Sequence, residues 1–351
     1  MNKARWGVLL LWGLVTGLAC AEDTPRVALT TSYSFTAWDG PSVDWQSQQS
    51  ATLGLAGRWG QSLNLEGQVV APFTKTVLTA DGLIRQLALT WNLNSWSVVT
   101  FGKQRLKWGT SRVFSAIDGL EPSYDPLHPQ AILDGVTGVK TEWLPNDWLS
   151  LSVLALPTPK LKDTKWAARA DVLWDEWDLS AGAIRSVDTE GNHATVYADF
   201  ARFFDRFGVY GEAQLKDVQT SSPRARTTAG FQIEFPVWLN GTLRWLTEYH
   251  YNGEGKKAGG SVGTYSYHYG YLGLSGLPVT EKLTLGASLL VGLDTGFGLG
   301  SWSAHYEVDQ NLSVDLDWRQ IGQLPGTADT PNELATLPQR DQVTLTVSAS
   351  Y

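Results

Sequence analysis

Basic side chains concentrate in one extended stretch of the chain, followed by a loop that carries both signs of charge. Lys103, Arg105 and Lys107 recur at every second residue and therefore share one face of an extended segment. Residues 109–135 then add Arg112, Asp118, Glu121 and Asp125. Bases that face acids across a gap create a transverse field that sorts polar solutes by charge. We take these residues as the candidate site; the sign of selection stays open, because the row is basic and the loop is largely acidic.

The chain offers little for catalysis or metal binding. Its histidines are scattered without metal-ligand spacing, at His128, His193, His250, His268 and His305. No glycine-rich loop precedes a helical pattern that would hold a phosphate. A Ser–His pair with His250 or His268 is the enzymatic alternative, and nothing in the sequence selects its serine. We therefore expect no enzyme activity, no cofactor and no metal site.

The elements that must position the charged stretch are β-strands. Most of the chain alternates apolar and polar residues in runs of about ten, as in residues 281–292 and 311–319. Eight short turns alternate with nine longer loops, which predicts about 18 strands, with 16 as the alternative, and puts both chain ends on the short-turn side. This sorting of connections indicates an all-β, transmembrane, antiparallel up-and-down β-barrel with short periplasmic turns and longer outer loops.

The polar face of many expected strands is charged. Residues 207–216 and 243–251 put Glu212, Lys216, Arg244, Glu248 and His250 on the face opposite the apolar one. Charges on so many strands would be costly in a dry core. A barrel of about 18 strands is wide enough for an aqueous channel. The sequence therefore favours a water-filled lumen.

The amino terminus has the pattern of a secretory signal peptide, which we place at residues 1–21. Lys3 and Arg5 precede an apolar run, and Ala19-Cys20-Ala21 fits a cleavage site; lipidation of Cys20 is the alternative. Cleavage after Ala21 leaves residues 22–351 as a single domain without cysteine, and with 25 basic against 35 acidic residues. That charge argues against nucleic acid as a partner. No apolar run is long enough for a transmembrane helix.

Aromatic residues gather at the ends of the expected strands. Eight tryptophans lie beside the short turns: Trp59, Trp91, Trp96, Trp143, Trp148, Trp174, Trp177 and Trp238. A second group lies at the opposite strand ends: Trp38, Trp108, Trp166 and Trp318. Two such bands are typical of a protein with two membrane interfaces. For the tyrosines at 265, 267, 269 and 271 we expect stacking at the lipid interface rather than a sugar-binding ladder.

Two segments resemble known barrel families. The last strand, DQVTLTVSASY, resembles the closing strand of Gram-negative outer-membrane barrels and implies that the barrel-assembly machinery binds this strand, which ends in Tyr351. The stretch FGKQRLKWGTSRVFSAIDGLEP resembles a strand and loop of alginate-export-like barrels. Its loop, 109–135, follows the expected fifth strand and resembles the porin loop that folds inward and narrows the channel. The whole chain resembles the porin superfamily.

The resemblance implies an outer-membrane channel for passive diffusion of small hydrophilic solutes, constricted by the 109–135 loop. The alternative is an export or assembly barrel that passes a polysaccharide or lipid with periplasmic partners. For the basic row the alternative is pairing with residues of the Lys140/Glu142 type on the next strand, or with lipopolysaccharide phosphates. Expected partners are outer-membrane lipid, lipopolysaccharide and the solutes; association into a homo-oligomer stays open.

Overall fold

The computed structural model describes most of the chain after the first 25 residues. The described residues are 26–39, 44–59, 62–72, 84–106, 108–117, 120, 135–158, 161–188, 191–220, 223–239, 241–253, 266–323 and 341–350. The expected signal peptide and the terminal Tyr351 therefore lie outside the described residues, as do the predicted site residues Lys107, Asp118, Glu121 and Asp125.

Eighteen β-strands and one turn of 3-10 helix make up the regular structure of the described residues. The strands are β1 Arg26–Asp39, β2 Asp44–Trp59, β3 Leu63–Pro72, β4 Ile84–Asn94, β5 Ser97–Gln104, β6 Val136–Asn146, β7 Leu149–Leu156, β8 Lys165–Trp174, β9 Trp177–Asp188, β10 Gly191–Phe204, β11 Phe207–Lys216, β12 Arg224–Pro236, β13 Thr242–Asn252, β14 His268–Pro278, β15 Leu283–Gly292, β16 Phe297–Glu307, β17 Leu312–Gln323 and β18 Asp341–Ser350. The 3-10 turn is η1, Leu161–Asp163. The described residues contain no helix long and apolar enough to cross a membrane.

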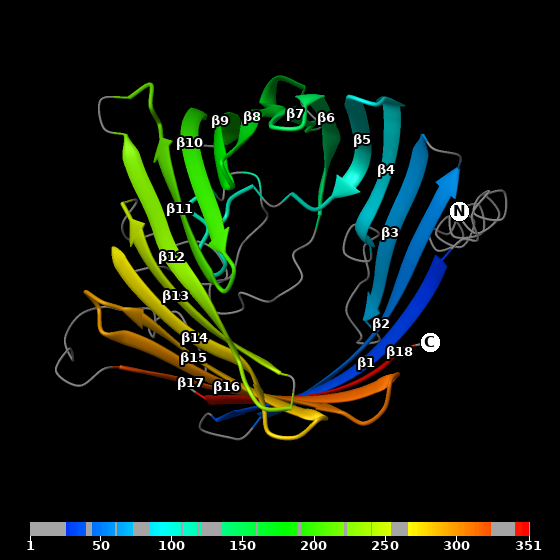
Figure 1. Ribbon diagram of the computed structural model, residues 1–351, viewed down its shortest axis with the longest axis vertical. Coiled ribbons are helices and arrows are strands. Elements are labelled where there is room, and N and C mark those ends of the chain that lie inside the picture. Colours follow the sequence, from blue (N-terminus) through cyan, green and yellow to red (C-terminus); the bar gives the residue numbers. More distant parts are fainter. Residues whose placement is uncertain are drawn as a thin grey trace.

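The strands form one closed antiparallel barrel. Each strand pairs with its neighbours in sequence, and β1 also pairs with β18 from Thr30↔Ser350 to Asp39↔Asp341. Closure leaves no unpaired sheet edge, which is the condition for a β-structure in lipid. Figure 1 shows the strands enclosing a central space. The all-β fold with 18 up-and-down strands is therefore confirmed.

The strands alternate as the sequence indicates. On β10, His193, Thr195, Tyr197 and Asp199 are buried, whereas the residues between them lie on the exposed outer face, including Val196 and Phe200, which are 41% and 40% exposed. A side-chain period of two places the buried set in the barrel interior. The same parity extends around the sheet, because each strand is registered on the next.

Seven of the eight predicted short turns lie at one end of the barrel, and the eighth, Gly60-Gln61, lies outside the described residues. Two of the two-residue turns use left-handed residues other than glycine: Asp175 and Glu176 have φ of 46° and 67°, and Asp205 has φ of 45°. Such turns match the twist of a two-residue hairpin. Connections at the opposite end vary in length more than expected. Only two residues separate β9 from β10, whereas 31 separate β5 from β6.

Exposed aromatic residues surround the short-turn end on the outside. Five tryptophans there are 47–66% exposed: Trp91, Trp96, Trp148, Trp174 and Trp238. Aromatic side chains on the outer face of neighbouring strands also contact one another. Their ring centroids are 6.3 Å apart for Phe204–Phe207, 6.2 Å for Phe207–Phe231 and 6.5 Å for Phe231–Trp245. An apolar ring with a polar edge suits a membrane interface. The side chains of Trp38 and Trp59 lie outside those described.

Two aromatic expectations are wrong. Trp108 is 7% exposed and packs inside the barrel rather than in an outer band. Tyr269 is 5% exposed, and Tyr269 and Tyr271 both belong to an interior apolar cluster rather than to a lipid interface. Their registers explain this, since they pair with Gly292 and Leu290, which lie on the lumenal face of β15. Alternation alone shows that such residues share a face, and does not show which face.

Candidate constriction site

The chain leaves the barrel wall after β5 and enters the interior. We call residues 105–106, 108–117 and 120 the inward segment; Figure 1 shows it inside the barrel, beside the green strands. Gly102 near the end of β5 has φ of +110°, and a Cβ there would lie 2.2 Å from the Leu87 carbonyl oxygen. Only glycine accepts that conformation and approach. The Gly135 N–H donates to the Arg85 carbonyl at 2.9 Å and holds the return of the chain to the wall.

The first anchor of the inward segment is apolar. Leu106, Trp108, Ile117 and Leu120 form one buried cluster with residues of β7 to β10: Leu154, Leu156, Ala167, Ile184 and Tyr197. Ile117 and Leu154 are fully buried, and the Trp108 and Tyr197 rings are 6.1 Å apart. Burial of each large apolar side chain contributes about 1.5–3 kcal/mol. Packing therefore fixes both ends of the inward segment on one side of the wall.

The second anchor is aromatic and lies further around the barrel. Val113 and Phe114 pack with Tyr269, Leu290, Phe297 and Leu299 of β14 to β16. The Phe114 ring stacks on His250 at 5.1 Å between centroids with an interplanar angle of 12°, and lies 5.8 Å from Tyr269. The two anchors lie on different parts of the wall, so the inward segment passes across part of the barrel interior.

At the second anchor, the carboxylate of Glu248 accepts several backbone N–H groups. It accepts N–H groups from Arg112 at 2.5 Å, from Val113 at 3.0 and 3.1 Å, and from Phe114 at 2.9 Å. The Tyr210 hydroxyl donates to the same carboxylate at 2.7 Å. Glu248 is 1% exposed. A buried carboxylate is stable only when its oxygens are hydrogen-bonded, and here the inward segment supplies most of those bonds.

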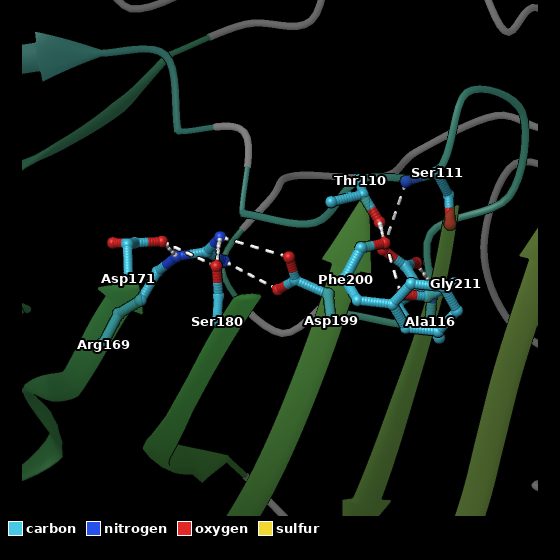
Figure 2. A network of polar contacts seen from close by, with 10 residues as sticks. Thr110, Ser111, Ala116, Arg169, Asp171, Ser180, Asp199, Phe200 and Gly211 are labelled. Carbon is cyan, nitrogen blue, oxygen red and sulfur yellow. Dashed lines mark hydrogen bonds and ion pairs between the residues drawn. The ribbon is translucent and has the colours of Figure 1, made fainter. Parts of the chain in front are cut away.

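A second buried carboxylate holds the adjoining part of the segment, whose residues Thr110, Ser111 and Ala116 are labelled in Figure 2. Glu212 is 4% exposed and accepts the Ser111 N–H at 3.4 Å and the Ala116 N–H. Thr110 Oγ1 donates to the Phe200 and Gly211 carbonyls, each at 3.4 Å. A Cβ at Gly109, whose φ is +135°, would lie 2.4 Å from Glu212 Oε2. The wall therefore binds the backbone of the inward segment here, and position 109 requires glycine.

An ion network stiffens the wall beside this carboxylate (Figure 2). Arg169 binds both oxygens of Asp199, at 3.0 and 3.3 Å, and its Nε lies 2.5 Å from Asp171 Oδ1. Ser180 Oγ accepts from Arg169 at 2.6 Å and donates to Asp171 at 2.7 Å. The Asp199 side chain is fully buried. Bidentate Arg–carboxylate pairing fixes geometry as well as charge, so β8, β9 and β10 present a rigid surface to the segment.

The predicted site residues do not form one lumenal row. Lys103 pairs with Leu87 and Thr137, and shares the face that carries the exposed Leu89 and Phe101, so its register position faces away from the lumen. The strand ends at Gln104, so Arg105 belongs to the inward segment. The expectation of a single face is thus wrong for Lys103 and Arg105, because the chain stops being a strand between them.

Two predicted residues do lie inside the barrel. Arg105 is exposed and its Nη2 donates to Gln68 Oε1 on the lumenal face of β3. Arg112 is exposed on the inward segment, and its guanidinium lies 5.8 Å from the centre of the Phe203 ring. On the lumenal face of β6, Lys140 and Glu142 pair with each other at 2.9 Å. Arg105 and Arg112 are the described cations of the proposed constriction.

Sequence reasoning placed Glu212 and Glu248 on the lumenal face and missed what they do. They were expected in water, whereas the inward segment buries both. Their partners lie about a hundred residues or more away in sequence, so no local pattern marks them.

Known outer-membrane protein structures are similar to this chain over the whole barrel. No family model matches the sequence, and neither does any curated protein. The outer-membrane protein OpdK of Pseudomonas aeruginosa superposes with a TM-score of 0.61 at 12% identity, covering 94% of this chain and 99% of that one. OccK3 (OpdO) of the same organism has a TM-score of 0.61 at 14% identity, with 97% and 99% covered.

A third structure belongs to a different kind of barrel. Wzi of Escherichia coli, described as a carbohydrate-binding β-barrel involved in group 1 capsule assembly, has a TM-score of 0.62 at 10% identity, with 99% of this chain and 88% of that chain covered. Structural similarity at such low sequence identity establishes the fold alone, so the function must be argued from the site. The chain has the porin-like fold of Gram-negative outer-membrane β-barrels, as the sequence predicts.

Proposed function

We propose that the chain is an outer-membrane channel through which small hydrophilic solutes diffuse passively, narrowed by the 109–135 loop. The observation that carries the proposal is the inward segment, anchored across part of the interior of a closed 18-stranded barrel by Glu212, Glu248 and two apolar clusters. A segment fixed to the inner wall at two places reduces the cross-section of the lumen.

Exposed charges on the lumenal face support a wet interior. The ion pair between Arg244 and Glu234 measures 2.9 Å, and these side chains are 53% and 33% exposed. His305 and Asp315 are 2.5 Å apart with side chains 40% and 36% exposed. Both pairs lie on inward register positions, and neither is covered by the inward segment. Charged groups are stable there because water solvates them.

The local charge of the narrowing is basic among the described residues. Arg105 and Arg112 are exposed there, while the carboxylates of Glu212 and Glu248 are occupied by backbone N–H groups. Opposite charge raises the local concentration of a solute and like charge lowers it. We infer that the narrowing favours anions over cations, with no catalytic step.

Single-channel recording in a planar bilayer tests the function. Refolded protein should give steady conductance steps, and a salt gradient should give a reversal potential on the anion-selective side. Insertion without steps would overturn the channel and favour the alternative, an export or assembly barrel kept closed until periplasmic partners act. The similarity to Wzi is the observation that keeps this second function in view.

A further inference from the structure

The lipid-facing surface of β9 carries an arginine near its long-loop end. Arg185 is exposed and alternates with Ile184, which is 2% exposed and belongs to the interior cluster of β7 to β10. Its side chain therefore points outward, away from the lumen. Among the residues that the structure describes, Arg185 has no hydrogen bond and no ion pair. A charge on this surface is costly in hydrocarbon and becomes acceptable at the membrane interface.

The neighbouring strand places a tryptophan beside this arginine. Trp166 on β8 is the direct cross-strand partner of Arg185. Side chains in such positions have Cβ atoms about 4.5–5.5 Å apart, so both can contact one ligand. Trp166 is 49% exposed, and its indole N–H has no acceptor within the described part of the chain. Guanidinium and indole groups donate hydrogen bonds and accept none, so the pair suits a ligand rich in acceptor oxygens.

Strand geometry sets the depth of the pair in the membrane. Trp174 and Trp177 pair at the short-turn end, and Trp166 and Arg185 each lie eight residues away from them along β8 and β9. Eight residues span about 26 Å of strand, or roughly 20 Å of height at a tilt of about 40°. The apolar band of such barrels is about 25 Å tall. The pair therefore lies near the edge of this band at the long-loop end, which faces the cell exterior.

At the opposite interface, an outward arginine is held by protein groups. Arg202 lies at the short-turn end of β10, and its Nη2 donates to Glu176 at 3.2 Å. Its guanidinium also lies 5.3 Å from the centre of the Trp177 ring and 4.5 Å from that of Phe204. The periplasmic interface thus supplies an acid for its cation, whereas no described residue supplies one for Arg185. Charge complementarity points to an anion of the outer leaflet.

Small side chains occupy the lipid-facing surface between the pair and the short turn. We call them the alanine strip, which consists of two cross-strand rows, Ala168–Ala183 and Ala170–Ala181. Larger side chains border the strip: Val153 on β7 is 37% exposed, and Val196 on β10 is 41% exposed. An acyl chain that runs from the pair toward the membrane centre would lie along this strip in van der Waals contact.

We propose that Arg185 and Trp166 bind lipopolysaccharide, with a phosphate of its lipid A on the Arg185 guanidinium and an acyl chain along the alanine strip. Lipid A carries its phosphates at the outer interface and its acyl chains below them, which is the order of the cation and the alanines on this wall. A guanidinium binds two phosphate oxygens at once, and the indole N–H adds a donor at the same level. The site lies on the outer surface, so it does not depend on conduction through the lumen.

Native mass spectrometry of the refolded protein in detergent tests the site, because it counts bound lipid A and gives its dissociation constant. The wild type should bind bisphosphorylated lipid A more tightly than the same lipid A without its phosphates. Arg185→Gln should weaken binding of the bisphosphorylated form about fivefold or more, because charge-assisted hydrogen bonds are lost. Binding of the dephosphorylated form should not change. Arg185→Lys keeps the charge without the bidentate geometry and should give an intermediate affinity.

Matched variants separate this site from general binding of lipid. Arg206→Gln removes an exposed arginine at the short-turn end, and Trp174→Leu removes a tryptophan that is 66% exposed there. Neither should weaken binding of lipid A, whereas Trp166→Leu should. Heat-dependent gel mobility verifies that each variant folds. If Arg185→Gln does not fold, Trp166→Leu replaces it, and the comparison of the two forms of lipid A on the wild type needs no variant.

Three outcomes would overturn the proposal. Equal affinity of the wild type for both forms of lipid A would show that phosphate is not recognised. Equal weakening by Arg185→Gln and Arg206→Gln would show that any surface arginine serves. Competition by inorganic phosphate, or equally tight binding of phosphatidylglycerol, would show a site for phosphate or for anionic lipid in general. None of these results bears on single-channel conductance, so the lipid site and the channel can fail separately.

Discussion

At the scale of single residues, two glutamates of the barrel wall hold the inward segment in place. Glu248 and Glu212 lie on strands of the wall, yet their carboxylates are bonded to the backbone of a segment more than ninety residues away in sequence. Charge-assisted hydrogen bonds of this kind are stronger than neutral ones, and burial makes their loss costly. The position of the inward segment thus depends on a few wall residues that do not belong to it.

Replacement of Glu248 by Ala removes the acceptor of the N–H groups of Arg112, Val113 and Phe114. Each N–H left unpaired in a buried site costs about 1–3 kcal/mol, so the segment should detach from this part of the wall. We expect larger and noisier single-channel conductance. Glu234→Ala, which removes a lumenal glutamate bonded to Arg244, should leave conductance steady. Identical traces for Glu248→Ala and wild type would show that Glu248 does not hold the segment.

Arg112 is the exposed cation of the inward segment and should set part of the charge selectivity. Arg112→Gln removes its charge and keeps its backbone bond to Glu248, so the reversal potential in a salt gradient should shift toward cations. Arg206→Gln changes an exposed arginine in a short turn and should cause no shift. An unchanged reversal potential in Arg112→Gln would remove Arg112 from the proposed constriction.

At the scale of elements, the inward segment behaves as a strap fixed by side-chain packing as well as by carboxylates. Its two anchors bury large apolar groups against different strands. Most of the segment has no regular secondary structure, so its order depends on these contacts. A change in the anchors should therefore free the segment without unfolding the barrel.

Double replacement Val113→Ala/Phe114→Ala tests this dependence. Loss of a buried phenylalanine side chain costs about 3–5 kcal/mol, most of which should fall on the segment. Trypsin should then cut the folded variant after Arg112, whereas the wild type resists, and circular dichroism should still report a β-barrel. Phe101→Ala, on the outer face of β5 and 41% exposed, is the control and should resist cleavage. Equal resistance in the double variant would mean that the second anchor is dispensable.

The connection between β15 and β16 makes a pH-dependent contact with the start of β14. Burial acts to raise the pKa of Asp294, but hydrogen bonds from the Tyr267 and His268 N–H groups, at 2.9 and 3.2 Å, outweigh it and hold the pKa below its usual value. A depressed carboxyl pKa stabilises the contact above the unfolded pKa, and this stability is lost as pH falls through the folded pKa.

Hydrogen exchange measures that contact. Referenced to the unfolded chain, amide protection at Tyr267 and His268 should fall as pH decreases below about 4. Asp294→Asn should show low protection at every pH, because its amide cannot accept both bonds as a carboxylate does. Protection that stays constant in the wild type down to pH 2 would contradict the role of Asp294.

The sequence predicted strands and turns better than it predicted faces. Alternation and turn residues are local, so the sequence predicted correctly the strand number and the seven short turns that lie among the described residues. The inward face of Tyr269, the burial of Trp108 and the outward position of Lys103 depend on register between strands and on where β5 ends. The segment's bonds to Glu248 join residues whose separation reaches 136 positions, and no single-sequence pattern encodes such a distance.

At the scale of the whole molecule, barrel closure and the inward segment together define the interior that a solute would cross under the proposed function. The barrel satisfies its backbone through pairing of β1 with β18, and its outer aromatic residues suit the membrane interface. The inward segment is anchored on one side of the interior. Selectivity should therefore reside in the lumen and not in the rim.

The most direct test is the single-channel conductance of the wild type compared with a variant whose residues 109–134 are replaced by a short Gly–Ser linker. Removal of the strap should widen the narrowest cross-section, so the account predicts steady wild-type steps and a several-fold larger conductance in the variant. Equal conductance in the two proteins would contradict the claim that the segment narrows the channel, and absence of conductance in both would contradict the channel.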